Sequence, residues 1–177
     1  MSNFLKNTIR FIVFLLVQVY VLNKIEPLHR FIVPYLYFLF ILWLPFSISR
    51  MWLLIIGFFT GLSLDYFTMT PGLHSAACVL IAYARPFIIN ILMPKDTADF
   101  NYREPSPKAM QWTPYAVYVF VLTLLHHGYM VFLEWMSFGS FLGFIIKVIA
   151  TTGVSLLLIF TVELLFPRKL KFRTNTA

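Results

Sequence analysis

The sequence predicts an all-α, polytopic membrane protein that forms one domain of six transmembrane helices. Hydrophobic residues make up 60% of the 177 residues and charged residues only 12%, and the mean hydropathy is +0.81. A soluble domain carries about 25% charged residues, so composition places most of this chain in lipid. Because backbone amides and carbonyls cannot bond to water in the bilayer core, every span is expected to be a helix.

The six helices are predicted from apolar runs that approach the length of a bilayer crossing. The first run ends in Asn23-Lys24-Ile25-Glu26 without a small-residue cleavage site, so we expect it to remain as a span. The second begins near Pro34, where proline is tolerated in a first turn, and ends near Pro45. Pro86 is expected to bend the fourth helix. The predicted spans are 5–22, 31–49, 51–66, 73–93, 114–133 and 141–166, with a cytoplasmic polar loop at 94–112 and a basic cytoplasmic tail at 167–177.

The distribution of basic residues predicts the orientation of these spans. Six spans place both termini on one side, and that side carries ten basic residues, whereas the other carries Lys24 and Arg30. The positive-inside rule then places both termini in the cytoplasm. The ten are Lys6, Arg10, Arg50, Lys95, Arg103, Lys108, Arg168, Lys169, Lys171 and Arg173.

Two stripes with the same four-residue spacing lie on the third and sixth spans. The stripes are Gly57, Gly61 and Asp65, and Gly139, Gly143 and Lys147. Small residues let helix backbones approach closely, and helix rise puts both charges at a similar depth, about 20 Å from the cytoplasmic face. We therefore expect the two spans to pack on these stripes with Asp65 near Lys147. Two alternatives remain open: His126 or His127 competes for Asp65, or Lys147 extends to the membrane surface unpaired.

A second intramembrane charge, Arg85, lies nearer the cytoplasm, at a depth of about 10 Å. Charges inside a membrane are costly and usually paired. Glu163, near the end of the sixth span, is the expected partner. The alternative is that Arg85 reaches the lipid headgroups.

No motif in the sequence indicates catalysis or a cofactor. His126 and His127 are adjacent, so they point about 100° apart on a helix and do not form one metal-binding face. Ser75, Ser140 and Ser155 lie outside any Gly-x-Ser-x-Gly turn, and no nucleotide-binding motif is present. The lone Cys78 is expected to be a packing residue. We therefore expect no enzyme, no cofactor, no metal and no nucleic-acid partner.

The stretch around Asp65 resembles the MreD family of bacterial rod-shape-determining membrane proteins. The resemblance rests on Gly61-Leu62-Ser63-Leu64-Asp65, on Pro71-Gly72-Leu73-His74, and on the small-residue run from Ala76 to Tyr83. These motifs cover about a quarter of the chain, and their order and spacing are more specific than their residue types. The polar loop at 94–112 is longer than the family pattern, and Arg85-Pro86 departs from it.

The resemblance implies a non-enzymatic scaffold of the cell-elongation machinery in the bacterial inner membrane. Its expected partner is an MreC-like single-span protein, with RodA, penicillin-binding protein 2 and the MreB filament in the same machinery and membrane lipid around it. The family fold is similar to the substrate-binding component of ECF-type vitamin transporters. That similarity supplies the alternative function, a small-molecule binder with a pocket facing outward.

Overall fold

The structure is a computed structural model that describes residues 3–25, 32–93, 104–136 and 140–166. All regular elements in these ranges are helices, and five are long and apolar enough to span a membrane: Leu5–Lys24, Arg50–Thr68, Leu73–Leu92, Trp112–Trp135 and Phe141–Leu165. In chain order the elements are α1 (Asn3–Leu16), η1 (Val17–Val21), η2 (Leu22–Lys24), α2 (Leu39–Leu42), α3 (Arg50–Thr68), α4 (Leu73–Leu92), α5 (Pro107–Met110), α6 (Trp112–Trp135) and α7 (Phe141–Leu165). The all-helical class is therefore confirmed, and five of the six predicted spans have a matching helix that is long and apolar enough to cross a membrane.

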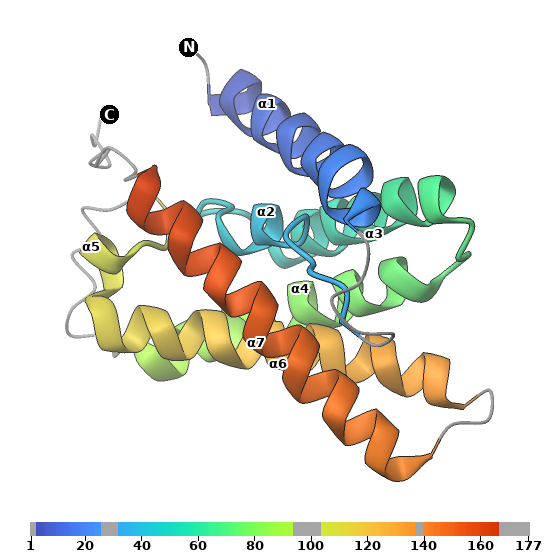
Figure 1. The fold of residues 1–177 in the computed structure, drawn as a ribbon. Coiled ribbons are helices and arrows are strands. Elements are labelled where there is room, and N and C mark those ends of the chain that lie inside the picture. The colour runs from blue at the N-terminus through green and yellow to red at the C-terminus, as the bar shows by residue number, and fades with distance from the viewer. Residues whose placement is uncertain (1–2, 26–31, 94–103, 137–139, 167–177) are drawn as a thin grey trace, which may run out of the picture.

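The predicted span at 31–49 is wrong as a helix. Its described part has no regular secondary structure from residue 32 to 36 and contains only the single helical turn α2. Figure 1 shows it running back through the bundle from the far end of α1 toward the start of α3. Every residue from 35 to 45 is buried, so this stretch lies inside protein. Irregular backbone is tolerated at membrane depth only in such a place. We call residues 32–45 the central segment.

Helices α3 and α4 form the closest pair, and two glycines at their contact explain why. A Cβ atom on Gly61 would lie 2.4 Å from the Cα atom of Ser75, and one on Gly57 would lie 2.9 Å from the Cβ atom of Ala82. Only hydrogen at these positions lets the two backbones approach. The expected pairing of this stripe with the sixth span is therefore wrong, because the glycines face α4.

The described glycine of the second stripe, Gly143, is not a point where another helix approaches closely. Gly143 follows the N-cap of α7, where its backbone N–H donates to Ser140 Oγ at 3.1 Å, and that same hydroxyl would be 2.8 Å from an added Cβ atom. Gly139 lies outside the described residues. Helix α7 packs on α6 instead, and it crosses the bundle obliquely in Figure 1.

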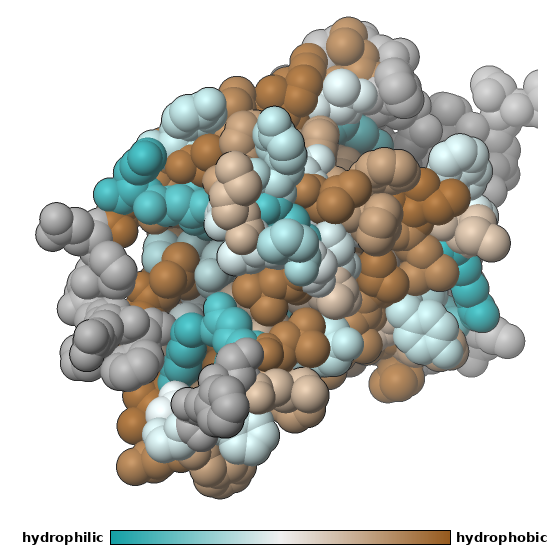
Figure 2. Space-filling view, turned by 90° about the vertical axis from the view of Figure 1, so that its right-hand side faces the viewer, coloured by the Kyte–Doolittle hydropathy of each residue, from teal (hydrophilic) through white to brown (hydrophobic). Residues whose placement is uncertain are grey.

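Different helix ends gather at the two opposite ends of the bundle. In Figure 1 the start of α1 and the end of α7, which are the two ends of the described chain, lie at the same end of the bundle, together with α5 and the starts of α3 and α6. The α3–α4 turn and the end of α6 lie at the opposite end. Figure 2 looks onto this opposite end, where hydrophilic and hydrophobic residues alternate in patches. The exposed side chains along the long helices are largely apolar, as a lipid-facing surface requires.

Candidate functional site

The central segment is the candidate functional site, because polar side chains from four surrounding helices converge on it. Its residues outside regular structure cannot satisfy their own backbone groups, and an unpaired backbone group in an apolar interior costs several kcal/mol, roughly 4–8 on a hydrocarbon scale. Gln18, fully buried in η1, supplies most of the partners. Its Oε1 atom accepts the N–H groups of Leu36 (2.8 Å) and Tyr37 (3.3 Å), and its amide donates to the Pro34 carbonyl at 3.1 Å.

The hydroxyl of Tyr37, whose amide donates to Gln18, is the centre of a buried polar cluster. It lies 2.8 Å from His126 Nε2, 3.1 Å from His74 Nδ1 and 3.6 Å from the Cys78 sulfur. The imidazole of His126 also stacks on Phe38, with ring centroids 4.4 Å apart. One hydroxyl thereby ties the central segment to both α4 and α6, and His74 and His126 act as structural hydrogen-bond partners.

His127 and Ser155 form a second buried pair next to this cluster. His127 Nε2 lies 2.9 Å from Ser155 Oγ, and the same hydroxyl accepts the N–H of Tyr35 at 3.0 Å. A serine nucleophile needs a reachable hydroxyl and a histidine oriented by a third group, usually a carboxylate. Here both side chains are fully buried, and His127 Nδ1 faces the Thr123 carbonyl at 2.9 Å. The arrangement holds the central segment against α6 and α7.

Arg85 lies on the part of the central segment nearest the termini. Its Nε atom donates to the Tyr118 hydroxyl at 3.0 Å and its Nη2 atom donates to the Leu44 carbonyl, while Tyr118 donates to the Leu42 carbonyl at 2.9 Å. Leu42 is the last residue of α2 and Leu44 comes just after its C-cap, so neither carbonyl has a partner within a continuing helix. The expected Arg85–Glu163 ion pair is wrong, because the guanidinium is aimed at this helix end.

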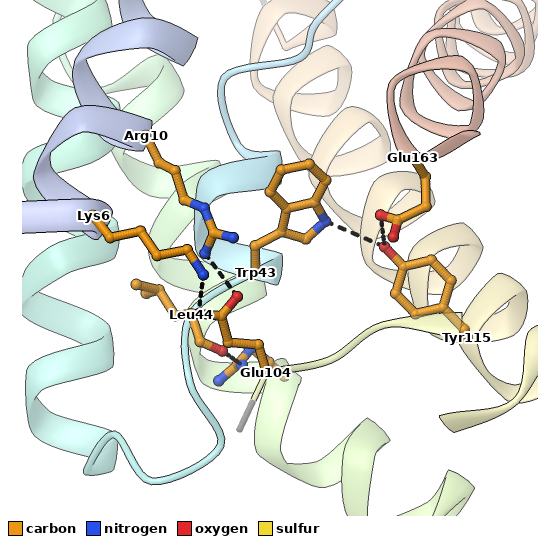
Figure 3. A network of polar contacts seen from close by, with 8 residues as sticks. Lys6, Arg10, Trp43, Leu44, Glu104, Tyr115 and Glu163 are labelled. Atoms are coloured by element: carbon orange, nitrogen blue, oxygen red, sulfur yellow. Dashed lines mark hydrogen bonds and ion pairs between the residues drawn. The ribbon is translucent and has the colours of Figure 1, made fainter. Parts of the chain in front are cut away.

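Glu163 joins a different set of contacts, shown in Figure 3. It accepts a hydrogen bond from the Tyr115 hydroxyl at 2.8 Å, and that hydroxyl accepts one from the Trp43 indole at 3.2 Å. Arg10 lies over the Trp43 ring at 5.5 Å. Helices α1, α6 and α7 thus meet at Trp43, at the end of the central segment.

Glu104 connects α1 to the chain that precedes α5. Figure 3 shows its carboxylate between two cations, with Arg10 Nη1 at 2.7 Å and Lys6 Nζ at 3.1 Å. Burial raises the pKa of this carboxyl, but the hydrogen bonds and charges of Arg10 and Lys6 outweigh burial, so the pKa lies below its ordinary value of 4.5. The ionised form is therefore favoured by folding.

Asp65 caps the start of α4 and does not meet Lys147. Its carboxylate accepts the backbone N–H groups of Gly72 (3.2 Å), His74 (2.9 Å) and Ser75 (3.0 Å), together with the Ser75 hydroxyl at 2.5 Å. Free amides at a helix N-terminus attract negative charge. The turn also needs Gly72, whose φ of +86° is reached without strain only by glycine.

Lys147 is paired with Glu134, which the sequence analysis did not consider. The expected Asp65–Lys147 contact is therefore corrected to two separate local arrangements. The alternative of Asp65 bound by His126 or His127 is also wrong, because those imidazoles bind Tyr37 and Ser155. Lys147 lies on α7 opposite the end of α6, where Glu134 is thirteen residues away in sequence.

Several residues that organise the site were missed by sequence reasoning: Gln18, Tyr37, Tyr118 and Ser155. Gln18 was visible as the one strongly polar residue within its apolar run. The two prolines at 34 and 45 enclose only ten residues, and this short interval was a further signal against a straight helix.

The described residues form an all-helical protein with five helices that could cross a membrane, consistent with a multi-pass membrane protein, and its centre is an irregular segment whose backbone is bonded by side chains. Within 3–25, 32–93, 104–136 and 140–166, no group of three His, Cys, Asp or Glu side chains could hold a metal ion. Comparison with protein-family models, with curated proteins and with solved structures finds no match for this chain.

Proposed function

We propose that this protein is a non-enzymatic membrane scaffold of the bacterial cell-elongation machinery, of the kind that the MreD-like motif implies. The proposal rests on the contacts that the residues of this motif make in the fold. Asp65, Gly72 and Ser75 form a rigid turn, and Gly57 and Gly61 lock the two helices that the turn joins. A rigid, membrane-embedded hairpin is suited to holding another chain.

The surface that such a turn would offer is apolar and aromatic. Tyr66 is 74% exposed, Met69 is 81% exposed and Phe67 is 47% exposed, all at the end of α3. Aromatic residues and methionine are enriched at protein interfaces. We assign the docking of an MreC-like single-span protein to this surface, with RodA and penicillin-binding protein 2 as further members of the same assembly.

Orientation in the inner membrane is part of the proposal. Lys6, Arg10, Arg50 and Lys108 lie in elements that meet at the end where the termini lie (Figure 1). The positive-inside rule assigns that end to the cytoplasm. The α3–α4 turn then faces outward, where the large outer domain of a single-span partner would be.

Co-purification from native membranes in mild detergent tests the scaffold. We expect an MreC-like single-span protein in about equal amount with the wild-type chain, and a loss of at least about fivefold with Tyr66→Ala/Met69→Ala, since exposed substitutions cost under about 0.5 kcal/mol of stability. Leu164→Ala/Leu165→Ala, equally exposed at the other end of the bundle, is the matched control and should retain the partner. Recovery of an energy-coupling ATPase with a bound vitamin would instead establish the transporter alternative.

A further inference from the structure

A cavity of about 200 Å³ lies between the end of α6 and the start of α7, at the end of the bundle opposite the termini. Its walls include Val131, the Trp135 and Phe144 rings, and the ion pair of Glu134 with Lys147. The two rings are 5.9 Å apart between centroids. No residue of the MreD-like motif lines this cavity, so its occupant is a question separate from the scaffold.

The size of the cavity restricts the occupant. Pockets that enclose drug-sized ligands measure roughly 300–1,000 Å³, so about 200 Å³ holds a small head and leaves the rest of a larger molecule outside. Strongly exposed apolar side chains follow directly on the lining residue Ser140 in the sequence, with Phe141 and Leu142 each 69% exposed. A molecule with a small polar head and long apolar tails fits this combination.

The two charged residues that line the cavity restrict the chemistry of the bound headgroup. Glu134 and Lys147 are 32% and 27% exposed and already neutralise each other. A head carrying one charge would meet attraction from one residue and repulsion from the other. A zwitterion can lie antiparallel to the pair, so that its anion meets Lys147 and its cation meets Glu134. Tryptophan also belongs at the headgroup level of a membrane, which agrees with Trp135 at a helix end.

We propose that this cavity binds the headgroup of an aminophospholipid, with the phosphate at Lys147, the primary ammonium at Glu134 and the glycerol against the two aromatic rings. The acyl chains then run along the lipid-facing sides of α6 and α7. This site does not depend on the scaffold function, because none of its residues belongs to the α3–α4 turn.

Native mass spectrometry of the full chain, released from nanodiscs of equal phosphatidylethanolamine and phosphatidylglycerol, tests the proposal. We expect the wild-type chain to retain phosphatidylethanolamine at least about fivefold over phosphatidylglycerol, and Glu134→Gln/Lys147→Gln to abolish that preference. Lys108→Gln, an exposed charge at the other end of the bundle, should behave as wild type. Equal retention of both lipids by the wild-type chain, or an unchanged preference in the double variant, would overturn the assignment.

A second measurement needs no variant. Soluble glycerophosphoethanolamine should displace phosphatidylethanolamine from the wild-type chain, whereas glycerophosphoglycerol at the same concentration should not. Displacement by both compounds alike would mean that Lys147 binds phosphate without recognition of the ammonium, and the proposal would then be wrong.

Discussion

A carboxylate buried in a membrane protein can be stabilised by a cation or by several hydrogen-bond donors, and Asp65 uses donors. Three amides and two hydroxyls, those of Thr70 and Ser75, surround it, while the expected cationic partner, Lys147, binds Glu134. The sequence showed two charges at similar depth, but depth does not fix the direction in which a side chain points. The cap could be expected only if the turn after Thr68 were already known.

Replacing Asp65 by alanine should lower the free energy of unfolding by about 3 kcal/mol, since each buried donor left unpaired costs about 1–3 kcal/mol. Thermal unfolding in detergent measures the effect. Ser63→Ala is the matched control on the same helix, because that hydroxyl only returns to its own helix at the Phe59 carbonyl. The charge swap Asp65→Lys/Lys147→Asp should be no more stable than Asp65→Lys, and rescue by the swap would contradict the cap.

The ion pairs of Glu104 with Lys6 and Arg10 should hold α1 in place in a pH-dependent manner. Because its pKa is lowered in the folded state, its contribution is fully present above the unfolded value and is lost as pH falls through the folded value. We expect the melting temperature of the wild-type chain to decrease below about pH 4.5 more steeply than that of Glu104→Gln. Parallel pH profiles of the two proteins would show that the carboxylate does not stabilise α1.

At the scale of elements, the α3–α4 pair depends on close approach of backbones. Gly61→Ala should destabilise by about 3 kcal/mol or more because the added methyl meets backbone atoms, and Gly57→Ala should cost less. Gly153→Ala is the matched control, since nothing lies within 4 Å of its added Cβ atom, and it should stabilise α7 by about 0.5–1 kcal/mol. Unfolding of the three variants in one detergent gives the order, and a neutral Gly61→Ala would contradict the packing.

The central segment depends in the same way on Gln18. Gln18→Met keeps the length of the side chain but removes the acceptor of the Leu36 and Tyr37 amides. Amide hydrogen exchange should then rise by at least about tenfold at Leu36 and Tyr37, equivalent to about 1.4 kcal/mol of lost protection, while the exchange of α4 should change little. Unchanged protection of Leu36 and Tyr37 would mean that another group holds them.

The helices were easier to predict than the central segment for a physical reason. The predicted spans 73–93, 114–133 and 141–166 agree with α4, α6 and α7 within two residues at each end, because a long apolar run has one stable form in lipid. Residues 31–49 are just as apolar, yet the backbone groups of this stretch are satisfied by side chains on other helices. These side chains are Gln18, Arg85, Tyr118 and Ser155. Partners so distant in sequence leave no local pattern to read.

At the scale of the whole molecule, the orientation of the chain in the membrane can be tested, because α5 and the end of α6 lie at opposite ends of the bundle. Cys78 is fully buried, so a single added cysteine can be labelled over the native background. In intact spheroplasts a membrane-impermeant maleimide should label Met136→Cys and leave Lys108→Cys unlabelled until the membrane is opened. Labelling of both positions from one side would contradict the proposed orientation.

The central segment also sets the order in which the chain can mature during synthesis. The hydrogen-bond partner of the Tyr35 amide, Ser155, is synthesised 120 residues later. The partner of the Leu44 carbonyl, Arg85, is synthesised 41 residues later. Until α7 has been inserted, the Tyr35 amide lacks Ser155 and must be satisfied in another way. Helix α7 therefore completes an early part of the chain, and a truncation before α7 would leave that part without its partner.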